Sequence, residues 1–122
     1  MAVWLEGYKS AWVERDADKA AALFSEDATY LDNPHNEPYK GRAGIHEYWS
    51  DVTSDQRGVT FDYEILTTYG NTAVAQWAAR FTSVSSGATV KLDGIFLLDF
   101  DENGLCSRLR EWWHVEVDQP DE

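Results

Sequence analysis

An aspartate that follows a short extended segment is the first residue in this chain that could do chemistry. Residues 28–31 are expected to be extended, and Asp32 stands between them and a loop, residues 32–38, which is rich in proline and asparagine. A carboxylate at the end of a strand can accept a proton, and apolar aromatic surroundings would raise its pKa toward neutral pH. Aspartate before Asn-Pro is also a common turn residue, so a purely local hydrogen-bonding role is the alternative.

A second carboxylate lies on the last expected strand, residues 105–117. Glu111 and Trp113 are two residues apart there, so they share one face of the strand. If that face is the inner one, Glu111 is a further candidate for acid–base chemistry. The alternative is a cross-strand ion pair with one of the arginines at positions 80, 108 and 110.

Histidines offer two more acid–base candidates. His35 lies in the loop after Asp32, where it could reach the mouth of a pocket, although a loop histidine is more often solvated. His114 follows Trp113, so strand alternation directs it to the opposite face unless a bulge intervenes.

The sequence does not contain the residue patterns that other common chemistries require. The single cysteine, Cys106, excludes disulfides and multi-cysteine metal sites, and no His-x-x-x-His spacing occurs. A glycine-rich phosphate loop, a nucleophile elbow and a dinucleotide fingerprint are also missing from the sequence. We therefore expect neither a metal nor a cofactor.

The elements that must position these residues fall into two halves. Apolar residues recur at helical spacing in the first half, which predicts helices around residues 4–12, 18–24 and 42–52. The second half predicts strands at 61–66, 77–81, 90–100 and 105–117, separated by turn signals such as Gly70-Asn71. This order predicts an α+β domain: three N-terminal helices packed on a strongly curved antiparallel sheet, a cone-shaped barrel with a central pocket.

Composition limits the domain count and the classes of partner. The chain has 122 residues, enough for one domain spanning 1–122, and 17 of them are aromatic (six Trp, six Tyr and five Phe). Acidic residues outnumber basic ones 22 to 10, and a net charge of −12 argues against nucleic acid and anionic membranes. Because no signal peptide or long apolar run is found, we expect a cytoplasmic protein.

Three segments carry a resemblance to a known superfamily. They are LFSEDATYLD at 23–32, EPYKG at 37–41 with AGIHEYW at 43–49, and the pair DGIF at 93–96 and REWWH at 110–114. In this order and spacing the chain resembles the nuclear transport factor 2-like superfamily. The resemblance is to its small-molecule branch of SnoaL-like and ketosteroid isomerase-like proteins, and it covers about residues 3–117. The motifs also look bacterial.

The resemblance implies roles for specific residues. It places the proton-shuttling base at Asp32 and the oxyanion-donating tyrosine at Tyr8, so the implied site is a base beside a hydroxyl donor in a water-poor pocket. The second oxyanion acid of ketosteroid isomerases would stand at Phe96, so that donor is missing here. By matching positions, six residues are expected to line the cavity: Trp12, Tyr48, Trp77, Phe96, Leu109 and Trp113.

The resulting expectation is a cofactor-independent isomerase, cyclase or lyase. Its substrate would be a small, flat, largely apolar ring compound, with steroid isomerisation disfavoured by the missing acid. The alternatives are a non-catalytic small-molecule binding protein that uses the same pocket and a protein-interaction module. The resemblance also implies a homodimer that pairs through the outer face of the sheet.

Overall fold

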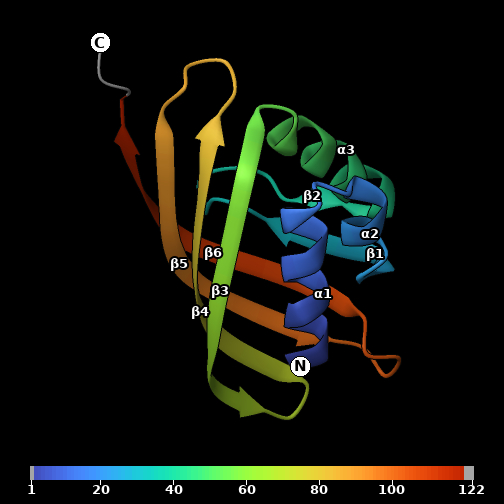
Figure 1. Ribbon diagram of the computed structural model, residues 1–122. Coiled ribbons are helices and arrows are strands. Elements are labelled where there is room, and N and C mark those ends of the chain that lie inside the picture. Colours follow the sequence, from blue (N-terminus) through green and yellow to red (C-terminus); the bar gives the residue numbers. More distant parts are fainter. Residues whose placement is uncertain (1, 120–122) are drawn as a thin grey trace.

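Three helices and six strands make up the part of the chain that the structure, a computed structural model, describes: residues 2–119 (Figure 1). Met1 and residues 120–122 of the expected 1–122 domain lie outside it. The helices are α1 (Ala2–Val13), α2 (Ala17–Ala21) and α3 (Gly41–Thr53). The strands are β1 (Phe24–Leu31), β2 (Tyr39–Lys40), β3 (Gln56–Tyr69), β4 (Thr72–Ser83), β5 (Thr89–Phe100) and β6 (Cys106–Asp118).

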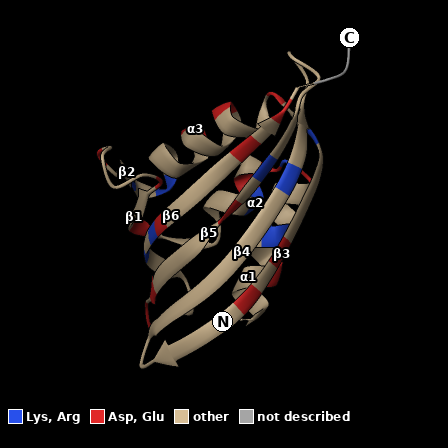
Figure 2. Ribbon diagram, turned by 90° about the vertical axis from the view of Figure 1, so that its left-hand side faces the viewer, with Lys and Arg blue, Asp and Glu red and all other residues tan. Residues whose placement is uncertain are grey.

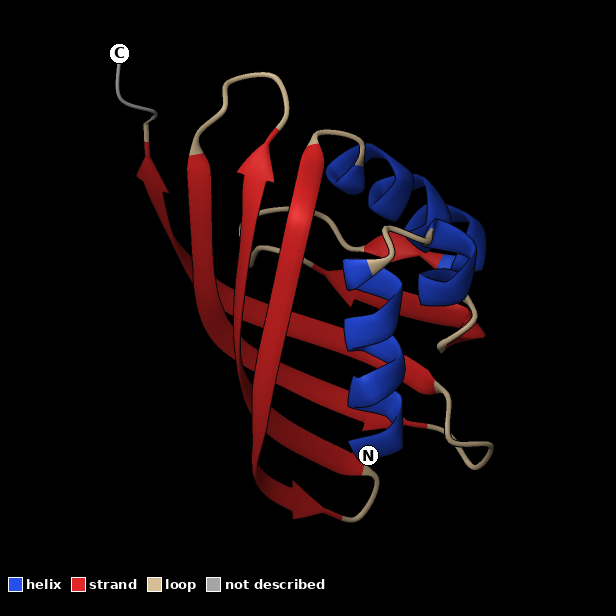
Figure 3. Cartoon of the chain, in the orientation of Figure 1, coloured by secondary structure: helices blue, strands red, loops and turns tan. Residues whose placement is uncertain are grey.

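The strands form one sheet in the order β2-β1-β6-β5-β4-β3. All neighbours pair antiparallel except β1 and β6, which run parallel, so the sheet is mixed and the expectation of a wholly antiparallel sheet is wrong at this one pairing. The sheet curls around the helices without closing, because β2 and β3 remain its two edges (Figure 3). The predicted α+β architecture, with helices on a strongly curved sheet, is otherwise confirmed.

The local sequence explains where the helices form. In α1 the buried side chains recur at spacings of three and four, which gives the helix one apolar face toward the sheet. Asp16 caps α2, since its side chain accepts a hydrogen bond from the backbone N–H of Lys19 at 3.1 Å. On α3, Ile45 and Trp49 are buried one turn apart on the same face.

The core lies between the helices and the concave face of the sheet. Phe61, Trp77 and Phe96 stack on three neighbouring strands, with Tyr8 of α1 packed against Phe96 at a ring-centroid distance of 5.2 Å. The aromatic residues therefore form one continuous cluster that joins α1, α3 and the sheet. Among the described residues, no helix combines the length and the apolar character needed to cross a membrane.

Candidate functional site

A cavity of about 360 Å³ lies in the aromatic layer between the helices and the sheet. This volume is within the range of small-molecule sites. Its walls come from α1, β1, α3, the start of β3 and the inner faces of β4, β5 and β6. Trp113 and Val115 in the wall are 38% and 51% exposed, so the cavity reaches solvent on their side. The lining residues are Tyr8, Trp12, Tyr30, Asp32, Tyr48, Trp49, Val52, Gln56, Trp77, Phe81, Val90, Leu92, Glu111, Trp113 and Val115.

Asp32 enters this wall directly after the last residue of β1. Its backbone carbonyl accepts a hydrogen bond from the indole Nε1 of Trp113 at 2.6 Å, which ties the end of β1 to β6. Asn36 donates a long hydrogen bond, 3.5 Å, to the Asp32 carboxylate from within the loop. The carboxylate is thus half-buried and lines the cavity, while only one weak local contact from the described chain competes for it.

Two tyrosine hydroxyls meet in the same wall. The hydroxyl oxygens of Tyr8 on α1 and Tyr30 on β1 are 2.9 Å apart, and both side chains are 1% exposed. Burial raises the pKa of both tyrosines well above its usual value, and ionisation of the nearby Glu111 would raise it further. Both groups therefore stay protonated, and because one hydroxyl bonds the other, the pair retains a hydrogen that it can donate to a ligand.

Glu111 is a buried acid in the cavity wall. It is 6% exposed, and within residues 2–119 its carboxyl group has neither a hydrogen-bond partner nor an ion-pair partner. Burial raises the pKa of Glu111 well above its usual value, and the neighbouring Asp32 carboxylate raises it further. The cross-strand ion pair considered as an alternative does not form: Arg110 faces Asp99 instead, at 3.8 Å.

The aromatic residues expected in the cavity divide into two groups. Trp12, Tyr48, Trp77 and Trp113 line it. Phe96 and Leu109 do not, because both are fully buried in the core behind the wall.

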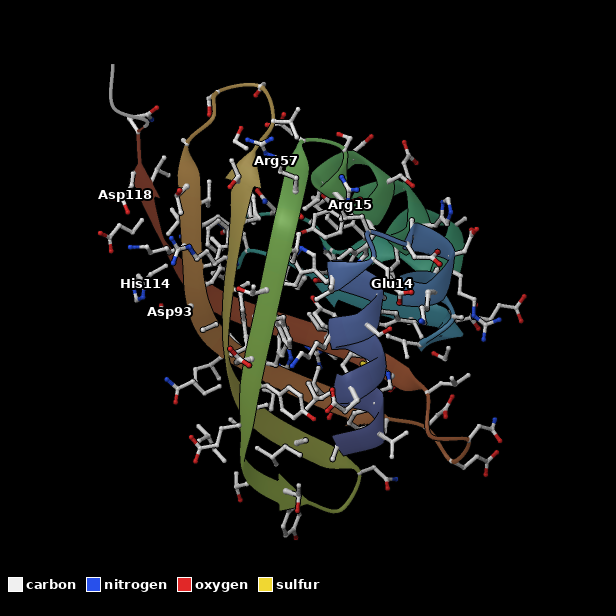
Figure 4. The ribbon with its side chains drawn as sticks, viewed as in Figure 1. Glu14, Arg15, Arg57, Asp93, His114 and Asp118 are labelled. Atoms are coloured by element: carbon white, nitrogen blue, oxygen red, sulfur yellow. The ribbon has the colours of Figure 1, made fainter. Side chains whose placement is uncertain are left out.

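Both histidine candidates lie away from the cavity lining. His35 is exposed in the loop after Asp32, where its backbone N–H donates to the side chain of Asn33 at 2.9 Å. His114 projects from the outer face of the sheet toward Asp93, with Nδ1 and the carboxylate 3.8 Å apart and its side chain 96% exposed (Figure 4). Strand alternation at Trp113 and His114 predicts these opposite directions, since no bulge interrupts β6 there.

Sequence reasoning missed three polar groups of the wall. Tyr30 stands two residues before Asp32, and the two-residue period of a strand was the signal that could have placed both on one face. Trp49 was expected in the core or an interface; its indole N–H and that of Trp77 are buried without a hydrogen-bond acceptor among the described residues. Gln56 accepts a hydrogen bond from Trp12 Nε1 at 2.8 Å.

As far as the described residues form it, the cavity wall carries no lysine, arginine or histidine. Within residues 2–119, no three His, Cys, Asp or Glu side chains are grouped so that they could hold a metal ion. The polar side chains that line the cavity are thus two carboxyls, three tyrosine hydroxyls and the amide of Gln56. Such a set can accept a proton at Asp32 and donate hydrogen bonds at several other points.

Known proteins share this architecture. A model of the SnoaL-like domain matches residues 5–109. No curated protein matches the chain at a significant level. Among solved structures, SalBIII, an epoxide hydrolase/cyclase-like enzyme in pyran ring formation of the polyether salinomycin, is similar with a TM-score of 0.82 and 22% identity. That alignment covers 95% of this chain and 94% of SalBIII.

Two further proteins of similar structure are described with small-molecule ligands. A computationally designed 17-OHP binder has a TM-score of 0.83 and 18% identity, covering 98% of this chain and 97% of that one. A Mycobacterium tuberculosis protein in complex with estradiol-17beta-hemisuccinate has a TM-score of 0.79 and 15% identity, covering 94% of this chain and 96% of that one. At these identities the likeness shows the shared fold.

Proposed function

Because this chain belongs to the SnoaL-like domain family, we propose that it is a cofactor-independent acid–base enzyme, an isomerase, cyclase or lyase, acting in its central cavity. Asp32 is the general base and Tyr8 the donor to the oxygen that gains negative charge. The substrate is a small, flat, mostly apolar ring compound. The observation that carries the proposal is that Asp32 and Tyr8 line one aromatic cavity, which reaches solvent beside Trp113.

The chemistry follows from this arrangement. A base removes a proton from carbon only if the resulting enolate is stabilised, and a tyrosine hydroxyl in a water-poor cavity can supply that hydrogen bond. Tyr8 suits the role because its raised pKa keeps it protonated through the neutral range. Aromatic walls add contact area for a ring substrate.

Proton exchange in a simple ring ketone tests the proposal. We expect the protein to accelerate the exchange of the carbon protons beside the carbonyl of 2-tetralone with D₂O, followed by NMR. Asp32→Asn should lower this rate by at least about 100-fold, the usual contribution of a general base. Asp27→Asn removes an exposed carboxylate from β1, the strand that leads to Asp32, so it serves as the matched control and should leave the rate unchanged.

The second candidate function is binding without turnover. Its support is the pair of neighbours described as a 17-OHP binder and an estradiol-17beta-hemisuccinate complex. In that case 2-tetralone would bind, the exchange rate would equal that of the buffer, and Asp32→Asn would change nothing. A protein-interaction module is the weaker alternative, because the protein's own tryptophans leave the cavity open.

A further inference from the structure

Glu111 stands where it can reach a ligand in the same cavity as Asp32. Glu111 on β6 pairs with Phe96 on β5, and Phe96 is fully buried. The glutamate therefore lies on the concave, packed face of the sheet. It lines the cavity, and within residues 2–119 no protein group satisfies its carboxyl. Its carboxyl oxygens are not among the sealed, unsatisfied side-chain atoms of residues 2–119, so they open onto the cavity, where a ligand can bond them.

The surroundings of Glu111 favour its protonated form. The titratable groups that face it are Tyr30 of β1, Asp32 directly after β1, Tyr8 of α1 and Tyr48 of α3, while β5 contributes the apolar Phe96. None of them is a cation, and burial in their midst disfavours a second negative charge beside Asp32. A protonated carboxyl has one O–H to donate.

We propose that Glu111 is the proton donor of this site, beside Asp32 as base, and that the pair selects a neutral substrate with a carbonyl oxygen. This inference rests on the proposed function, and it adds a catalytic residue and a substrate class to it. Asp32 and Glu111 both lie in the cavity wall, one half-buried at the end of β1 and the other buried on β6.

The proposed step balances without any external reactant. Asp32 takes a proton from the carbon next to the carbonyl, and the electron pair of that C–H bond forms the C=C bond of the enol. The carbonyl π electrons move to oxygen, which receives the proton of Glu111. Asp32 is then protonated and Glu111 ionised, and return of a proton to carbon with loss of the enol proton to Glu111 restores both groups.

The rest of the wall supports a neutral acceptor ligand. An anionic substrate would meet Asp32 without a compensating lysine, arginine or histidine in the described lining. The tyrosine hydroxyls of the lining are donors, and a ligand that carries an oxygen acceptor would suit them better than a hydrocarbon. A ketone satisfies both conditions.

The test follows 2-tetralone by two readouts in wild type, Glu111→Gln and Glu111→Leu. Exchange with D₂O reports the reaction, and the infrared carbonyl stretch of the bound ketone reports the hydrogen bond to its oxygen. We expect the stretch to lie lowest in wild type, higher in Glu111→Gln and highest in Glu111→Leu. Exchange should fall by about 100-fold in Glu111→Leu, as for loss of one oxyanion donor.

The pH profile separates proton donation from a structural role. In wild type the exchange rate should fall as pH rises through the pKa of Glu111, and Glu111→Gln should lack this falling limb because its amide does not titrate. Glu116→Gln is the matched control, because it removes an exposed carboxylate from β6. It should keep the wild-type carbonyl stretch, the wild-type exchange rate and the fall of that rate at high pH. Circular dichroism confirms that each variant is folded.

The outcomes distinguish the two proposals. An unchanged stretch and rate in both Glu111 variants, with exchange still dependent on Asp32, would overturn the role of Glu111 and leave the proposed function standing. No exchange in wild type would remove the proposed function. A carbonyl stretch that is low in wild type and higher in Glu111→Leu would then still support Glu111 as a donor. Tighter binding of 2-naphthoate than of 2-tetralone would refute the preference for a neutral carbonyl compound.

Discussion

At the scale of the residue, the site depends on two carboxyl groups in different environments. Asp32 is half-buried beside a loop, whereas Glu111 is buried among aromatic rings with no polar partner in the described chain. One environment tolerates a carboxylate and the other disfavours it, which is how a single cavity can hold a base and an acid together. The resemblance to ketosteroid isomerases implies an acid at the Phe96 position. Glu111 is the cross-strand partner of Phe96, so the proposed acid is on the neighbouring strand.

The buried acid should cost stability, and the sign of its pH dependence follows from the raised pKa. Between the ordinary pKa of an unfolded glutamate and the higher pKa of Glu111 in the fold, the folded state binds more protons. The free energy of unfolding therefore falls as pH rises through that interval. Glu111→Gln removes the effect and should be more stable than wild type at neutral pH, by roughly 0.5–2 kcal/mol.

Urea unfolding at a series of pH values checks this expectation. The stability difference between Glu111→Gln and wild type should shrink as pH falls toward the ordinary glutamate value, where both states of wild type are protonated. Glu116→Gln, on the exposed part of the same strand, should show no such trend. A Glu111→Gln protein that is less stable than wild type at neutral pH would mean that the ionised carboxylate has a stabilising partner.

At the scale of the element, the pairing of β5 and β6 positions the cavity mouth. Gly94 pairs with Trp113 across these strands. A Cβ at Gly94 would collide with the backbone carbonyl of Trp112 and would lie 2.9 Å from Trp113 Cβ. The missing side chain thus lets β6 approach closely enough for the Trp113 indole to bond the carbonyl of Asp32.

Gly94→Ala should therefore disturb both the sheet and the site. We expect a loss of about 1–3 kcal/mol in the free energy of unfolding, the usual cost of forcing atoms into a packed region. Proton exchange in 2-tetralone should fall as well, since Trp113 no longer holds the end of β1. Thermal unfolding and the exchange assay measure the two effects.

Gly44→Ala on α3 is the control for this substitution. Its added Cβ would meet only ordinary contacts, at 3.9 Å and beyond, and alanine favours a helix over glycine. The variant should be as stable as wild type or slightly more stable. Equal behaviour of the two alanine variants would show that β5 and β6 adjust freely at Gly94.

Local patterns in the sequence predict α1, α3 and the antiparallel hairpins well, because spacing and turn residues are local properties. The second expected helix, 18–24, is wrong at its end, because α2 ends at Ala21 and Phe24 begins β1. The parallel pairing of β1 with β6 escaped prediction, since it joins residues as distant as Tyr30 and Leu109 and leaves no local mark. The same pairing extends β1 back to Phe24, beyond the expected start at Ala28. The core position of Phe96 also depends on how tightly Tyr8 and Trp77 pack over it, which spacing does not specify.

At the scale of the whole molecule, the outer face of the sheet is the surface that the helices leave uncovered (Figure 2). Its centre is mainly apolar: Trp112 is 45% exposed beside its cross-strand partner Ile95, and Val74 pairs with Leu97 next to them. Gln76 and Arg110 are the polar neighbours of these residues. Charges of both signs lie toward one end of this face (Figure 2). Arg80, Lys91 and Glu116 are neighbours across β4, β5 and β6. A patch that is apolar at its centre and mixed in charge at its rim suits contact with a second copy of itself.

We therefore expect a homodimer that pairs through this face and dissociates when its centre is charged. Trp112→Glu should shift the protein from dimer to monomer in sedimentation equilibrium, because two buried glutamates would face each other across a two-fold axis. Val84→Glu, which places the same charge at an exposed position between β4 and β5, should remain dimeric. Each chain carries a net charge of −12, so added salt should strengthen the dimer by screening the repulsion. A wild-type protein that sediments as a monomer at all salt concentrations would exclude this interface. The proposed reaction in the cavity would then take place in a monomer.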